Sequence, residues 1–227
     1  MNDPSLDMNK AIVLNMVYEL GAWCTSVIVK LADGTIVHSR NLDYNHAAED
    51  MRHITYRAVF VEDGQYKFDA VMFGGTIGTY TRMKAGSFSI SQNTRYKNKN
   101  PLKLLLNIGM LFSGFGQENS WLLRKVLTDC DHYACAYEEL AHWPLNGMGY
   151  LILAGTKGDE GVVISRNEFG PAHEDHLDSK NGTWFLVQAN NDEWDSGCTG
   201  RCASATDRIA AIGQANMTLD ILRNDVM

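Results

Sequence analysis

Hydrophobic and polar positions along the first part of the chain change period once, from a helical to a strand pattern. Residues 9–21 carry apolar side chains at the spacing of an amphipathic helix, which is expected to end at Gly21. Segments rich in β-branched and aromatic residues then follow at 24–31, 35–40, 53–62 and 65–74. Asp33-Gly34 and Asp63-Gly64 are hairpin turn signals, so two successive hairpins of one antiparallel sheet are expected.

The second part of the chain mixes the two periods in longer blocks. Residues 75–93 continue the strands through a glycine-rich turn. The helical period then covers 101–112, 120–130 and 133–143, strands are expected at 149–155, 161–166 and 183–190, and a last helix at 203–213. Strands, helices, strands and a helix in this order predict an α+β fold in which helices cover an antiparallel sheet.

Composition and charge narrow the class of protein. The 227 residues are 45% hydrophobic, which suits one globular domain with a sizeable core. Their formal net charge is -7, and phosphate binding needs clustered cations, so nucleic acid is excluded as a partner. The most apolar segment, 101–116, has the length of a buried helix or of one that lies on a lipid surface, and burial is favoured.

The cysteines give a second constraint. The five cysteines form no Cys-x-x-Cys pair and have no nearby histidine cluster, so we expect no metal site. Because the number is odd, at least one thiol stays free even where the others pair. Two Asn-x-Thr sequons, at Asn181 and Asn216, weakly favour a glycoprotein of an oxidising compartment.

One of these thiols stands beside charged residues. If the turn at 33–34 folds its two strands together, residues 40–43 lie beside Cys24, and a one-residue slip decides whether Arg40 or Asp43 shares its face. Cys24 is then a small buried side chain near a surface ion pair, a papain-like nucleophile, or an N-terminal nucleophile. The papain-like case needs a histidine base, and nothing marks His38 as that partner. In the third case, cleavage before Cys24 frees an amine that acts as the base.

Several separated motifs carry a family resemblance. They are CTSVIV, HSRNLDY, FGGTIGTYT, FSISQNTRY, GVVISRNEFGPA, NGTWFLVQANNDEW and IGQANMTLD. Together they resemble the N-acylethanolamine-hydrolysing acid amidase and acid ceramidase family of cysteine N-terminal nucleophile hydrolases. The likeness runs in order through nearly the whole chain.

The resemblance implies a fold and an activity. The fold is an αββα sandwich, with residues 1–23 as a helical remnant of a pro-segment and 24–227 as a catalytic domain. Because relatives continue further, this domain is either truncated at its C-terminus or a divergent compact form. A zymogen of this kind cleaves itself between Trp23 and Cys24. Cys24 then hydrolyses linear amide C–N bonds in fatty-acyl amides without a cofactor.

The resemblance also implies roles for individual residues. Arg40 positions the thiol and the acyl carbonyl, and Asp43 accepts a hydrogen bond from the α-ammonium group. Asn190 contributes to the oxyanion hole. Arg201 matches a second active-site arginine of the family, which comes later in the sequence than the one at Arg40. The loop before Arg201 is shorter than in the family.

Substrate and partners are expected from the same family. Tyr80, Asn93, Leu105 and Phe112 are assigned to substrate binding, where an apolar slot receives an acyl chain. The predicted partners are a fatty-acyl amide lipid, a membrane surface or micelle, and a pro-segment or alpha chain, in a lysosomal or other acidic secretory compartment. NLDY, RNEFGPA and GQANMTLD favour an acylethanolamine substrate over ceramide. A catalytically silent lipid-binding relative is the alternative of a different class.

Overall fold

The structure is a computed structural model of the chain, and it describes residues 23–43, 48–95 and 117–227. The helices expected at 9–21 and 101–112 lie outside these residues. So do Leu105 and Phe112.

The described residues form strands and helices in a mixed order. The strands are β1 (Trp23–Lys30), β2 (Ile36–Asp43), β3 (Thr55–Glu62), β4 (Gln65–Phe73), β5 (Thr81–Lys84), β6 (Phe88–Thr94), β7 (Gly149–Ala154), β8 (Gly161–Arg166), β9 (Pro171–His176) and β10 (Phe185–Gln188). The helices are α2 (Ala48–His53), α4 (Asn119–Asp129), α5 (Tyr133–His142), α6 (Glu193–Ser196), α7 (Arg201–Ile212) and α8 (Leu219–Ile221). Short helical turns lie at Ser179–Asn181, Gln214–Asn216 and Leu222–Val226. Among the described residues, no helix is long and apolar enough to cross a membrane.

Two antiparallel sheets lie face to face. The smaller sheet has the order β10-β1-β2, and the larger has the order β3-β4-β5-β6-β7-β8-β9. Both expected hairpins form, but they belong to different sheets, so the expectation of one shared sheet is wrong. The physical reason is that β1 is buried along nearly its whole length, so it must be covered on both faces as the centre of its own sheet.

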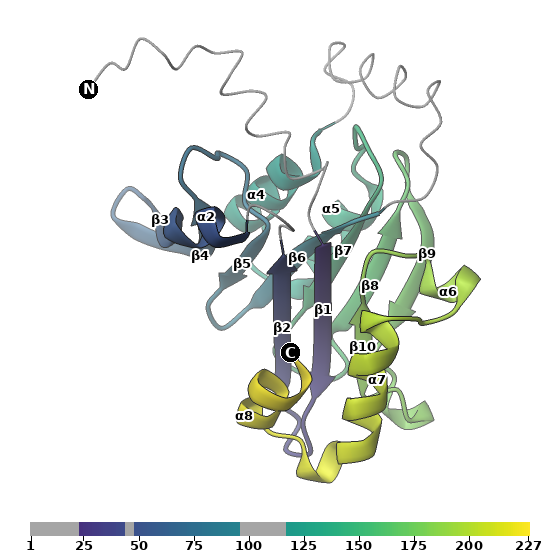
Figure 1. The fold of residues 1–227 in the computed structure, drawn as a ribbon. Helices are drawn as coiled ribbons and strands as arrows, with labels where there is room; N and C mark the ends of the chain where they lie inside the picture. The colour runs from purple at the N-terminus through teal and green to yellow at the C-terminus, as the bar shows by residue number, and fades with distance from the viewer. Residues whose placement is uncertain (1–22, 44–47, 96–116) are drawn as a thin grey trace.

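Helices cover the outer faces of both sheets, which gives four layers (Figure 1). α4 and α5 pack on the larger sheet through a cluster that includes Leu122, Leu127 and Leu140. α7 and the C-terminal helical turns pack on the smaller sheet around Val27 and Ile209. This αββα arrangement is the layered α+β fold that the sequence predicts.

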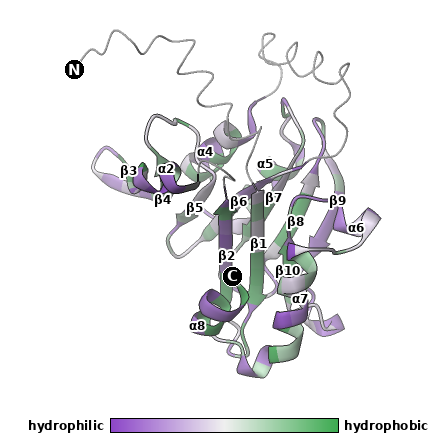
Figure 2. Cartoon of the chain, viewed as in Figure 1, coloured by the Kyte–Doolittle hydropathy of each residue, from purple (hydrophilic) through white to green (hydrophobic). Residues whose placement is uncertain are grey.

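A third apolar cluster joins the two sheets. Ile28 of β1 packs against Tyr150 and Ile152 of β7 and Leu186 of β10. Figure 2 shows hydrophobic colour along β1 and hydrophilic colour on much of the adjoining β2. The space between the sheets therefore has an apolar part around Ile28 and a polar part around Ser26 and Arg40, and the polar part holds the site described below.

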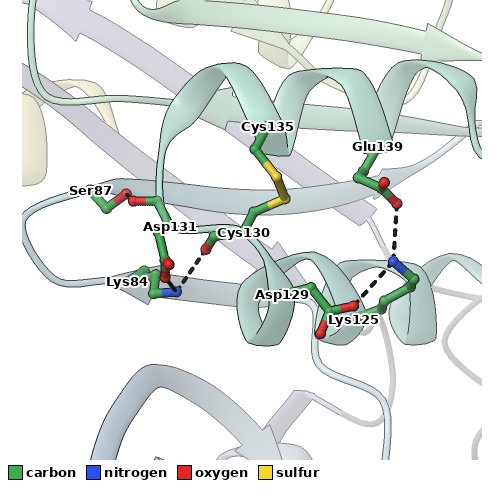
Figure 3. The surroundings of a disulfide bond; sticks show 8 residues. All are labelled: Lys84, Ser87, Lys125, Asp129, Cys130, Asp131, Cys135 and Glu139. Atoms are coloured by element: carbon green, nitrogen blue, oxygen red, sulfur yellow. Dashed lines mark hydrogen bonds and ion pairs between the residues drawn. A yellow bond between two sulfur atoms is a disulfide. The ribbon is translucent and has the colours of Figure 1, made fainter.

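A disulfide links the two helices on the outer face of the larger sheet (Figure 3). Cys130 at the end of α4 bonds to Cys135 in α5. Lys84 of β5 donates to the carbonyl oxygen of Cys130 at 2.7 Å and pairs with the carboxylate of Asp131 at 2.6 Å. The bridge and the ion pair together hold the connection between the helices against the end of β5.

The cluster between the sheets generates a test of stability. Ile28→Ala removes a side chain that is 0% exposed, so we expect it to lower the free energy of unfolding by about 2–5 kcal/mol. Ile77→Ala is the matched control, because Ile77 is 47% exposed, and it should cost about 0.5 kcal/mol. Urea unfolding of both variants measures the difference, and equal losses would contradict the placement of Ile28 between the sheets.

Candidate active site

One cysteine that takes part in neither disulfide of the described chain lies between the two sheets. Cys24 is the second residue of β1, is fully buried, and packs against Phe73 and Tyr80. Directly opposed residues of an antiparallel pair share a face, and Cys24 opposes Leu42 while Ser26 opposes Arg40. Alternation along the strand puts Cys24 and Ser26 on one face. The register therefore places Arg40 on the face of the thiol.

Arg40 holds the thiol with a guanidinium that is itself fixed. Its Nη2 donates to Cys24 Sγ at 3.2 Å and to the carbonyl oxygen of Gln92 at 2.6 Å. Its Nη1 donates to Thr81 Oγ1 at 2.6 Å, and its Nε donates to Asn93 Oδ1 at 3.4 Å. These hydrogen bonds hold the cation against the sulfur of Cys24.

Asn190 and Arg201 approach the same residue from the end of the smaller sheet. The backbone nitrogen of Cys24 donates to Asn190 Oδ1 at 2.9 Å, and Asn190 Nδ2 donates to the carbonyl oxygen of Thr94 at 2.7 Å. Arg201 donates from Nη1 to the carbonyl oxygen of Cys24 at 2.7 Å and from Nη2 to Asn190 Oδ1 at 2.8 Å. Both backbone polar groups of Cys24 are thus bound by these two side chains.

Arg201 contacts the residues on both sides of the bond between Trp23 and Cys24. The guanidinium carbon of Arg201 lies 5.4 Å from the centre of the Trp23 ring, a cation–π distance. Arg201 is the first residue of α7, and the disulfide between Cys198 and Cys202 closes the loop that contains it. This short closed loop restricts where the guanidinium of Arg201 can go.

Asp43 takes a different position from the other predicted residues. It opposes Trp23 in the register, so it lies on the face of β2 that points away from the thiol, and it is exposed. In the continuous chain the nitrogen of Cys24 is an amide and offers no ammonium group to a carboxylate. The role of Asp43 toward a free α-ammonium group stays a prediction.

The predicted substrate residues fall into three groups. Tyr80 is buried beside Cys24, whereas Asn93 is buried in the polar network around Arg40. Leu105 and Phe112 lie outside the described residues. A cavity of about 620 Å³ opens next to Arg40, and apolar side chains such as Val71 and Met83 form part of its wall.

Sequence reasoning did not predict the positions of two side chains near Arg40, those of Thr81 and His38. Thr81 binds it directly, and His38 lies two residues before it on the same face of β2. Burial of the His38 ring, together with the positive charge of Arg40, lowers the pKa of His38 from 6.5 to about 4. Alternation along β2 would have placed His38 and Arg40 on one face, but no pattern in the sequence gives their partners across the sheets.

The pKa of His38 predicts how stability depends on pH. Between pH 4 and 6.5 the unfolded chain binds a proton that the folded chain does not, so stability should fall as the pH is lowered through this range. The contribution is about 2 kcal/mol, after allowance for the partial exposure of His38 and for Arg57, Asp69, Arg82 and Lys84, which line the same cavity.

Urea unfolding at both ends of this pH range measures the effect. His38→Gln should flatten the profile, whereas His132→Gln, at an exposed position, should leave it unchanged. The same slope in wild-type protein and His38→Gln would contradict a neutral folded His38.

Two related kinds of curated protein are similar in sequence to the chain. No family model matches the chain. The chain is 35% identical to N-acylethanolamine-hydrolyzing acid amidase of Rattus norvegicus over 96% of its own length and 59% of that protein. It is 28% identical to acid ceramidase of the same species, over 83% of this chain and 51% of that protein. The chain thus spans less than two thirds of the length of these curated relatives.

A solved structure shows the same likeness. The Caenorhabditis elegans ortholog of N-acylethanolamine-hydrolyzing acid amidase superposes with a TM-score of 0.79 at 30% identity, and the match covers 89% of each chain. The match confirms the αββα fold of the N-terminal nucleophile hydrolase type.

Proposed function

The chain belongs to the family of N-acylethanolamine-hydrolyzing acid amidase and acid ceramidase, and from this premise we propose that it is a self-processing cysteine amidase with Cys24 as its nucleophile. The observation that carries the proposal is the convergence on Cys24 of three side chains from separate segments. Arg40 binds its sulfur, Asn190 its nitrogen and Arg201 its carbonyl oxygen.

Self-cleavage is the first reaction of the proposed enzyme. Cys24 Sγ attacks the carbonyl carbon of Trp23, the C–N bond breaks, and the nitrogen of Cys24 takes up a proton to become an amine. Water then hydrolyses the thioester, which leaves a carboxylate on Trp23 and restores the thiol. Arg201 supports this step because it binds the main chain of Cys24 and the ring of Trp23, and so holds the bond in place.

Amide hydrolysis uses the groups that cleavage produces. The freed α-amine takes the proton of the thiol, the thiolate attacks the substrate carbonyl, and the amine returns the proton to the leaving nitrogen as the amide C–N bond breaks. Water then hydrolyses the acyl thioester, which releases the fatty acid and restores the thiol. Asn190 Oδ1, which already accepts from the nitrogen of Cys24, keeps that amine in place. An amide has two N–H donors, so the contact with Thr94 leaves Asn190 one donor for the acyl oxygen. In this form Asp43 accepts from the α-ammonium group.

The proposed substrate is a fatty-acyl amide of the N-acylethanolamine type. Identity favours this choice over ceramide, because the chain is 35% identical to the rat amidase and 28% identical to the rat ceramidase. The residues expected to receive the acyl chain include Tyr80, Leu105 and Phe112. The enzyme would work at a membrane surface or micelle in a lysosomal or similar acidic compartment, because both groups of relatives are named as acid enzymes.

The decisive experiment follows processing and turnover in the same sample. Wild-type chain incubated at acidic pH should yield a new polypeptide that begins at Cys24, detected by mass spectrometry, and should then release fatty acid from an acylethanolamine. Cys24→Ala removes the nucleophile, so both reactions should be lost while the thermal unfolding midpoint stays close to that of the wild type. Cys24→Ser should still process, but slowly.

A control separates loss of the nucleophile from loss of fold. Ser165→Ala removes a buried hydroxyl that has no hydrogen-bond partner among the described residues, so it should process and turn over like the wild type. An intact mass throughout, with no fatty acid from either acylethanolamine or ceramide, would overturn the proposed function.

A further inference from the structure

A chain of buried polar side chains connects Arg40 with a histidine that the proposed mechanism does not use. His38 Nδ1 lies 2.9 Å from Ser89 Oγ, and His38 Nε2 lies 2.9 Å from Ser91 Oγ. Ser91 Oγ is 3.0 Å from Ser26 Oγ, and Ser26 Oγ donates to Asn93 Oδ1 at 2.9 Å. These residues come from β1, β2 and β6, so the chain crosses from one sheet to the other.

The amide of Asn93 fixes one end of this chain. Its Nδ2 lies 2.8 Å from the carbonyl oxygen of Gln188 and 3.2 Å from that of Ala189. Two carbonyl oxygens can only accept, so the atom that faces them must be the nitrogen. Asn93 Oδ1 is then the acceptor for both the hydroxyl of Ser26 and the Nε–H of Arg40.

Starting from Asn93, the donor and the acceptor of each hydrogen bond in this series can be assigned. Ser26 has a single hydroxyl hydrogen and gives it to Asn93, so its oxygen must accept the hydrogen of Ser91. The oxygen of Ser91 must in turn accept from Nε2–H of His38. A neutral histidine carries one ring proton, so Nδ1 accepts from Ser89, and the low pKa of His38 is consistent with this neutral form.

We propose that His38 is a positioning residue that, through Ser91, Ser26 and Asn93, holds the guanidinium of Arg40 against the sulfur of Cys24. As a role in turnover this inference rests on the proposed function, but as a statement about Arg40 it does not. This series of hydrogen bonds affects the position of Arg40 in two ways. The hydrogen-bonded side chains tie β2 to β6 across the sheets, and they present Asn93 Oδ1 as the acceptor for the Nε–H of Arg40.

The effect on catalysis is measured with His38→Leu and His38→Gln. Leucine can neither donate nor accept, so we expect kcat to fall about 10- to 100-fold with KM within about twofold, as for a group that orients a catalytic residue. Glutamine offers both a donor and an acceptor and should recover most of the loss. Equal activity of His38→Leu and wild type, or no recovery in a folded His38→Gln, would overturn the inference.

Ser91→Ala tests the same chain at a second point, in case His38→Leu does not fold. It removes the buried hydroxyl that links His38 to Ser26 by hydrogen bonds, and we expect a fall in kcat of about tenfold. Ser165→Ala is the matched control, because both serines are 0% exposed but Ser165 Oγ has no hydrogen-bond partner among the described residues. Identical kcat values for the two variants would overturn the inference.

Two NMR measurements keep this inference separate from the proposed function, because neither needs turnover. Nitrogen-15 spectra should show the proton of His38 on Nε2, and a proton on Nδ1 with a bare Nε2 would overturn the inference. The Nε–H of Arg40 should exchange with solvent about tenfold faster in Ser91→Ala than in Ser165→Ala. If both results are obtained, and the wild-type chain neither processes itself nor hydrolyses amides, only the proposed function fails.

Discussion

The antiparallel register between β1 and β2 decides which side chains the thiol of Cys24 meets. With Cys24 opposite Leu42 and Ser26 opposite Arg40, the guanidinium and the sulfur share the face between the sheets. A slip of one residue would send Arg40 to the helical side and bring Asp43 to the thiol, because side chains alternate along a strand. Ile36, on the same face of β2 as Arg40, makes such a slip costly, since Ile36 would lose its packing against the apolar cluster between the sheets.

Local pattern predicted most elements but not how the sheets divide. Alternation and turn residues predicted β1 to β4, β7 and β8, and helical period predicted α4, α5 and α7 within a few residues. β9 (Pro171–His176) was missed because its PAHEDH sequence is polar, and it lies at the edge of the larger sheet. The assignment of the two hairpins to different sheets depends on contacts between distant segments, which no local period encodes.

The site shows the same limit. The motifs identified Cys24, Arg40, Asn190 and Arg201, and the structure brings all four together. They could not show that Asn190 presents its oxygen to Cys24, nor that Thr81 of β5 binds Arg40, since each pair is far apart in the sequence. Nor could they show that His38 lies beside Ser89 and Ser91 of β6. Asp43 differs for another reason, because its expected partner is an ammonium group that the uncut chain does not contain.

The pairing of the other cysteines bears on how the thiol of Cys24 stays reduced while the chain folds. Both disulfides join residues close in sequence, five apart for Cys130–Cys135 and four apart for Cys198–Cys202. Loops this short close quickly, so each bridge can form before the two sheets meet. Under oxidising conditions, the four thiols that could pair with Cys24 are therefore consumed early. The order of closure therefore favours a native state in which the sulfur of Cys24 is still reduced.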